Sequence, residues 1–243
     1  MKIKILKTVI GLAIFIFLLS FSARRHACKE ISDFKIEIDH SENNRFISTD
    51  MVKEILDGKD LNVSKVPLGN LDIYKIEQVI ASNPFVKRAD VFCDIDGTMN
   101  VETIQKTPVM RISNGADEFY LSDELSRIPL SKSYSAEVLI ASGKIETEDF
   151  EGLKQLSESI SDDKLLKKHI IAVKKEAPNS FNLLVNKGDY IIEFGELEDF
   201  EEKFEKLKLF YNEYLGKVGM NYYTKINLKF SNQIVATKRN HDE

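Results

Sequence analysis

The chain has 243 residues, 43% of them hydrophobic, with 15 phenylalanines and no tryptophan, a globular composition long enough for two ordinary domains. A formal net charge of -5, with basic residues scattered among acids, argues against a nucleic-acid-binding protein. Two separate cysteines, Cys28 and Cys93, do not make a disulfide framework, so the fold has to be stabilised by packing.

The N-terminus contains an uncharged apolar segment, residues 8–23, which is typical of membrane targeting. At a rise of about 1.5 Å per residue, the stretch from Ile5 to Ala23 matches a hydrocarbon core of about 30 Å, so we predict a transmembrane anchor after a short tail, residues 1–7. The alternative is a cleaved signal peptide with a poor cleavage site at Ser20-Phe21-Ser22. The Arg24-Arg25 pair favours the anchor, but the basic residues flank the span evenly and do not orient it.

The next segment begins with a predicted strand and a predicted helix. Phe34, Ile36 and Ile38 alternate with polar residues, as in a strand with one buried face. Ser48 can cap a short helix that carries apolar residues at helical spacing and ends at Asp57-Gly58. A second helix is predicted from four apolar residues, Ile73, Ile76, Val79 and Ile80.

A break at Asn83-Pro84 separates the second helix from a predicted hairpin, because the residue before a proline avoids the α region. Ala89, Val91, Cys93 and Ile95 alternate with polar residues or Phe92 and are predicted to share one face. Asp96-Gly97 then favours a tight turn, and Met99–Gln105 is the returning strand. The order strand, helix, helix, strand, strand over residues 33–107 resembles a POTRA module, in which two helices pack against a sheet of about three strands.

Beyond Pro108 the sequence predicts a second, strand-rich domain, residues 108–238, with no low-complexity linker. The predicted strands are Val109–Ile112, Phe119–Leu121, Val138–Ala141, Ile170–Lys174, Phe181–Asn186, Tyr190–Phe194, Tyr222–Phe230 and Gln233–Lys238, with a helix near Thr147–Ser161. The clearest helix is Glu198–Leu215, whose predicted buried face is Phe200, Phe204, Leu207, Tyr211 and Tyr214. In the penultimate strand, Ile226, Leu228 and Phe230 are predicted to share a face.

No motif in the chain indicates catalysis or metal binding. Asp94-Ile95-Asp96-Gly97 is superficially similar to a calcium loop, but Gln105 stands where that loop needs a bidentate glutamate. The four histidines are far apart in the sequence, and no nucleophile elbow or phosphate-binding loop occurs. We therefore expect no catalytic residue, cofactor or metal.

Several motifs in chain order resemble the FtsQ/DivIB family of bacterial cell-division proteins, in the form of its Bacteroidetes-like branch. They are Ile76-Glu77 through Asn83-Pro84-Phe85-Val86 to Ala89-Asp90-Val91, Gln105-Lys106-Thr107-Pro108, Tyr120-Leu121-Ser122 with Pro129-Leu130-Ser131, and the run from Ile226 to Val235. The resemblance implies an α+β fold: a single transmembrane helix, a POTRA module (β-α-α-β-β), then a mixed α/β domain whose sheet ends in C-terminal edge strands, with a tail at 239–243.

The resemblance also implies a function and a location. It implies a non-enzymatic divisome scaffold in the inner membrane, single-pass, with a short cytoplasmic tail and a periplasmic bulk at the division site. Its implied partners are FtsB-like and FtsL-like single-span proteins, other divisome proteins through the POTRA module, and no nucleic acid. Two alternatives stay open: a POTRA-type docking or chaperone subunit in outer-membrane or secretion assembly, and a secreted hydrolase.

The resemblance implies that the last strands of the second domain bind the FtsB-like partner, and an exposed terminal strand presents unpaired backbone groups to such an extended partner. The candidate residues are Gln233, Ile234, Val235, Ala236 and Thr237, with Tyr222 and Tyr223 as secondary aromatic anchors. In the competing interpretation Ile234 and Val235 are ordinary core residues, and residues 238–243 cover the edge.

Overall fold

The computed structural model describes residues 2–27, 30–40, 44–58, 61, 63, 66–115 and 117–239, and the chain divides into two compact units, Met1–Gln105 and Lys106–Glu243. The first unit begins with helix α1 (Lys2–Ala27). Among the described residues there is no helix both long enough and apolar enough to cross a membrane. Cys28 and the expected C-terminal tail beyond Arg239 lie outside the described residues.

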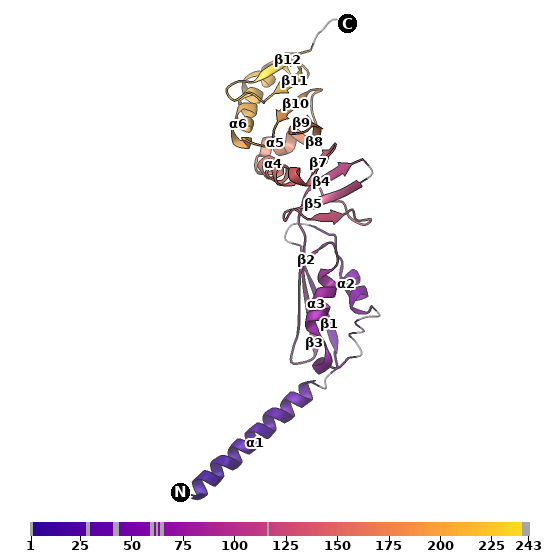
Figure 1. Ribbon diagram of the computed structural model, residues 1–243, viewed down its shortest axis with the longest axis vertical. Coiled ribbons are helices and arrows are strands. Elements are labelled where there is room, and N and C mark those ends of the chain that lie inside the picture. Colours follow the sequence, from indigo (N-terminus) through magenta and orange to yellow (C-terminus); the bar gives the residue numbers. More distant parts are fainter. Residues whose placement is uncertain are drawn as a thin grey trace. The chain divides into compact units, whose positions relative to one another are not determined.

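The rest of the first unit is a three-stranded sheet with two helices (Figure 1). Its elements are β1 (Asp33–Asp39), α2 (Thr49–Leu56), the 3-10 turn η2 (Leu68–Asn70), α3 (Ile73–Ala81), β2 (Val86–Cys93) and β3 (Thr98–Gln105). The strand order is β1-β3-β2, with β1 parallel and β2 antiparallel to β3. Helix α2 contacts β1 and α3, and α3 contacts β2. The predicted order of strands and helices is therefore confirmed.

Local signals in the sequence account for these boundaries. Ser48 Oγ accepts a hydrogen bond from Met51 N at 3.2 Å and caps α2, as predicted. Gly97 has φ 96°, a conformation that glycine adopts without strain, in the turn between β2 and β3. Ile95 was predicted on the buried face of β2, and this is wrong: it lies in the turn and is 86% exposed, because the strand ends at Cys93.

Gln105, the last residue of the first unit, is a buried hydrogen-bonding hub. Its Oε1 accepts from the backbone N–H groups of Phe46 at 2.9 Å and Ile47 at 3.0 Å. Its Nε2 donates to the carbonyl oxygens of Asp39 at 3.2 Å and Asn44 at 3.1 Å. One side chain thus bonds the end of β1 to the segment that leads into α2. Buried backbone groups need such partners.

Replacing Gln105 by leucine should destabilise the first unit by about 3 kcal/mol, because at least two buried backbone N–H groups lose their acceptor. Chemical denaturation followed by circular dichroism measures the loss. Gln78→Leu, on the exposed side of α3, is the matched control and should change stability by less than about 0.5 kcal/mol. Equal stability of the two variants would contradict the proposed hub.

The second unit is a nine-stranded mixed sheet with helices α4, α5 and α6 stacked along one side (Figure 1). Its elements are β4 (Pro108–Asn114), β5 (Asp117–Ser122), β6 (Arg127–Pro129), β7 (Leu139–Ser142), the 3-10 turn η3 (Thr147–Asp149), α4 (Phe150–Asp162), α5 (Lys164–His169), β8 (Ile170–Ala177), β9 (Ser180–Val185), β10 (Ile191–Gly195), α6 (Phe200–Phe210), the π-helical segment η4 (Tyr211–Leu215), α7 (Gly216–Val218), β11 (Tyr223–Asn227) and β12 (Val235–Lys238). The strand order is β12-β11-β10-β9-β8-β7-β4-β5-β6. Each predicted strand has a counterpart, but the strand predicted over Tyr222–Phe230 ends at Asn227, and the last strand begins at Val235 and not at Gln233. Strand β6 and helix α5 were not predicted.

Two predictions about buried faces in this unit are wrong. Tyr214 was placed on the buried face of one long α-helix, but it is 56% exposed and Leu215 is buried instead. The reason is that η4 is π-helical, and its wider turn moves the core-facing position from Tyr214 to Leu215. Phe230 is 47% exposed because β11 ends at Asn227 and the chain then turns.

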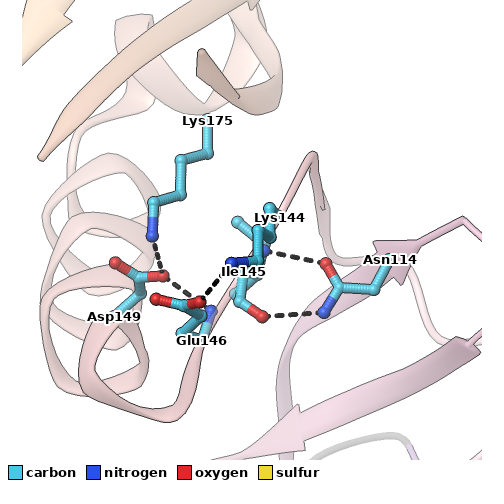
Figure 2. Close-up of polar contacts among 6 residues, drawn as sticks. All are labelled: Asn114, Lys144, Ile145, Glu146, Asp149 and Lys175. Atoms are coloured by element: carbon cyan, nitrogen blue, oxygen red, sulfur yellow. Dashed lines mark hydrogen bonds and ion pairs between the residues drawn. The ribbon is translucent and has the colours of Figure 1, made fainter. Parts of the chain in front are cut away.

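A buried ion pair stabilises the start of α4 (Figure 2). Lys175 Nζ lies 2.6 Å from Asp149 Oδ2, and each side chain is only 9% exposed. The same oxygen accepts from Glu146 N at 2.7 Å, and Asn114 donates to and accepts from the backbone of Ile145. These contacts connect β4, the start of α4 and β8 around charges that are costly to leave unpaired.

Asp149→Asn should reduce the free energy of unfolding by roughly 3 kcal/mol, because the Lys175 ammonium stays buried without its counter-charge. Glu176→Gln breaks the exposed pair with Lys174 at 2.9 Å and should cost less than about 1 kcal/mol. Thermal denaturation of both variants beside the wild type measures the difference. A smaller loss for Asp149→Asn than for Glu176→Gln would contradict the assignment.

Candidate protein-binding site

Strand β12 lies at one end of the nine-stranded sheet, and within the described chain its only neighbour is β11. The two strands are antiparallel, with Ile226 opposite Ala236 and Asn227 opposite Val235. The other side of β12 is therefore a sheet edge, a row of backbone N–H and C=O groups that an extended segment can pair with. This places the last predicted strand at an edge of the sheet.

Of the predicted site residues, Val235, Ala236 and Thr237 lie in β12, and Gln233 and Ile234 lie in the segment before it. Ile234 and Ala236 are partly buried and pack against the core of the unit. Gln233 and Thr237 are exposed, and Val235 is 43% exposed. Ile234 contacts the core, as the competing interpretation expects, whereas Val235 is exposed, as the binding interpretation expects.

An apolar groove of about 430 Å³ adjoins the edge. Leu209 of α6 is 62% exposed and Tyr214 of η4 is 56% exposed, and both line this one groove. The groove is lined by Lys206, Leu209, Phe210, Tyr214, Tyr223, Asn232, Gln233, Ile234, Ala236 and Lys238. The edge and the groove together form one surface on which backbone pairing and side-chain insertion can occur side by side.

The two predicted tyrosines have different places on this surface. Tyr223 lines the groove, and its ring centroid is 5.4 Å from that of Phe210. Tyr222 stacks edge-on against Tyr223 with centroids 4.9 Å apart, and Lys238 Nζ lies 5.5 Å from the Tyr222 ring centroid. Tyr222 is therefore not part of the groove lining, but its ring packs against Tyr223, which is.

A buried polar chain anchors the π-helical segment that presents Tyr214. His169 Nε2 lies 2.8 Å from Tyr190 OH, which donates to Tyr211 OH at 3.2 Å. Burial lowers the pKa of His169, assisted by the charge of Lys187, and burial raises the pKa of both Tyr190 and Tyr211. The chain is therefore neutral at physiological pH, and it fixes the first residue of η4.

The charge of the groove is positive. Its ionisable lining residues, apart from tyrosine, are Lys206 and Lys238, and none of its lining residues is acidic. Within the described residues there is no group of three or more histidine, cysteine, aspartate or glutamate side chains that could hold a metal ion. The groove lining thus offers apolar contact, hydrogen bonding and two ammonium groups.

Leu209 and Tyr214 were not identified as site residues from the sequence. Leu209 stood on the polar side of the predicted helix, where single apolar residues are common, and Tyr214 was assigned to the core. No local pattern indicates a π-helical turn, since it depends on which residues the rest of the unit buries. Only the structure brings these two side chains to the edge strand.

A small sheet module followed by a larger sheet with a free terminal edge is an architecture suited to protein interaction. Comparison with family models agrees with this class: a POTRA-like domain matches residues 26–104, and the model described as FtsQ/DivIB, C-terminal related, matches residues 107–237. No curated protein that was compared with the chain matches it. Because the second match covers more than half of the chain, the chain belongs to the FtsQ/DivIB family.

Family membership indicates a role as a cell-division scaffold, associated with the membrane at the division site. The family is generally one of non-enzymatic division scaffolds. Its POTRA domains imply protein–protein interaction with other divisome proteins.

The free energy of unfolding should decrease as the pH is lowered, and part of this decrease should depend on His169. Its pKa is lower in the folded state than the unfolded value of about 6.5, so this contribution is present above pH 6.5 and is lost as the pH falls towards the folded pKa. Urea denaturation at about pH 7.5 and 5.5 should show a smaller decrease for His169→Gln than for the wild type. His40→Gln, in the other unit, should keep the wild-type decrease. An equal decrease in all three proteins would contradict the role of His169.

Proposed function

We propose that this protein is a membrane-anchored divisome scaffold that binds an FtsB-like partner, with its FtsL-like companion, along β12. It binds these partners at the septum and links them to the septal peptidoglycan-synthesis machinery. The observation that carries the proposal is the edge of β12 that no described strand pairs with, beside an apolar groove. Strand addition there supplies backbone hydrogen bonds, and alternate side chains of the partner enter the groove and give specificity.

The other sheet edges support this choice because each is protected. On β1, Lys35 and Glu37 form an exposed ion pair at 2.9 Å, a charged edge that disfavours pairing. On β6, the strand is three residues long and ends in Pro129, which has no backbone donor. Only short or charged pairing surface is available at these two edges.

The edge of β2 is protected by a side chain rather than by its length. The carboxylate of Glu77, on α3, accepts the backbone N–H of Val91 at 2.9 Å, a group that a partner strand would otherwise use. Arg88 and Asp90 form an exposed ion pair at 2.7 Å on the same strand. By comparison, β12 carries exposed Val235 and no such bond at its outer side among the described contacts.

The membrane anchor in the proposal is residues 8–23, preceded by a cytoplasmic tail, residues 1–7. It rests on the sequence, in which residues 8–23 carry no charge and are mostly apolar. Anchoring raises the effective concentration of partners in the same membrane, so modest contacts at β12 suffice. The POTRA module, residues 33–107, and the β domain, residues 108–238, are then periplasmic.

The proposal is tested by purifying the intact chain from crosslinked native membranes and identifying its partners by mass spectrometry. FtsB-like and FtsL-like single-span proteins are the expected partners. Recovery of outer-membrane assembly or secretion components in their place would contradict the proposal and favour a POTRA-type docking subunit.

Tyr214→Ala should reduce recovery of the FtsB-like partner about tenfold or more, because an aromatic side chain that fills part of the interface is lost. Ile171→Ala is the matched control, since Ile171 is 49% exposed on β8, inside the sheet and outside the groove lining. It should leave recovery unchanged. Equal recovery with Tyr214→Ala and wild type, at equal bait levels, would show that the groove is not the binding surface.

A further inference from the structure

Lys206 connects helix α6 to the turn that leads into the edge strand. Its Nζ donates to the carbonyl oxygens of Phe230 and Ser231, each at 2.8 Å, and to Glu202 Oε1 at 3.1 Å. All three donor positions of the ammonium are therefore used. The side chain is only 18% exposed, although both carbonyl-bearing residues are exposed.

Lys206 also lies next to the proposed binding surface. It lines the apolar groove beside β12 and also a polar depression of about 400 Å³ that includes Phe230 and Ser231. Its stem is thus a wall shared by the two hollows. The turn that it holds continues through Asn232 and Gln233, both groove-lining, into Ile234 and then β12.

We infer that Lys206 is a positioning residue for the partner-binding edge: it fastens the β11–β12 turn to α6 and so pre-orders β12 and one wall of the groove. The part of this inference that concerns partner binding rests on the proposed function. The turn carbonyls lie at the surface, where water can replace the ammonium, so the bonds contribute little to overall folding. These bonds instead reduce the conformational entropy of the turn before a partner binds. Without them, a partner strand would have to order the turn when it binds.

A matched pair of variants separates this role from ordinary helix stabilisation. Lys206→Met removes the ammonium and keeps an unbranched apolar stem. Lys217→Met removes an equivalent pair, since Lys217 Nζ lies 3.1 Å from Glu213 four residues earlier, as Lys206 does from Glu202. The described contacts of Lys217 include no bond to the turn. Lys206→Arg restores donors that can reach carbonyl oxygens.

The first test needs no partner. Amide hydrogen exchange of the purified full-length chain in detergent should show residues 231–238 exchanging about tenfold faster in Lys206→Met than in the wild type, with the rest of the second unit unchanged. Lys217→Met should match the wild type, and Lys206→Arg should restore most of the protection. Unchanged exchange at 231–238 in Lys206→Met, or faster exchange throughout the unit, would overturn the inference.

The second test measures recovery of FtsB-like protein from crosslinked native membranes, at equal bait levels. Lys206→Met should lower it about tenfold, while Lys217→Met and Lys206→Arg should not. Faster exchange together with undiminished recovery would overturn the link to binding. Faster exchange with no FtsB-like protein recovered even by the wild type would contradict the proposed function and leave Lys206 as the residue that orders the turn.

Discussion

Within the described residues, strand β12 pairs with a neighbour on one side alone, and the proposed partner binding depends on its other side. A strand inside a sheet satisfies its N–H and C=O groups on both sides, but a terminal strand has one side open to any extended segment. The protein limits that exposure at β1, β2 and β6 with charges, a carboxylate cap and a short proline-ended strand. Among the described contacts β12 has no such protection and lies beside an apolar groove, so we propose strand addition at this edge.

The groove beside that edge is shaped by the core of the second unit. The buried chain His169–Tyr190–Tyr211 fixes the start of the π-helical segment. That segment then turns Leu215 inwards and Tyr214 outwards. Lys206 acts on the other side by holding the turn before β12. The shape of the proposed binding surface thus depends on a buried polar chain outside the groove lining and on Lys206, which lines the groove.

Many element boundaries could be predicted from the sequence, because caps, proline breaks and glycine turns depend on residues close together in the chain. The cap at Ser48, the break at Asn83-Pro84 and the turn at Gly97 are local, and the structure contains each of them. The exposure of Tyr214 was not predictable, since a helical pattern assumes 3.6 residues per turn and the π-helical segment violates it. The short strand β6 has three residues and too little pattern to detect. The groove joins α6 and η4 to β11 and β12, so its lining depends on tertiary packing and not on any local motif.

The most direct measurement of the central claim is site-specific photocrosslinking of the full-length chain in native membranes. A photoreactive residue at Val235, on the open edge, is compared with one at Phe92, an exposed side chain on the capped strand β2. The account predicts a crosslink from position 235 to an FtsB-like single-span protein and none to it from position 92. A crosslink to that protein from position 92 alone, with position 235 silent, would contradict it.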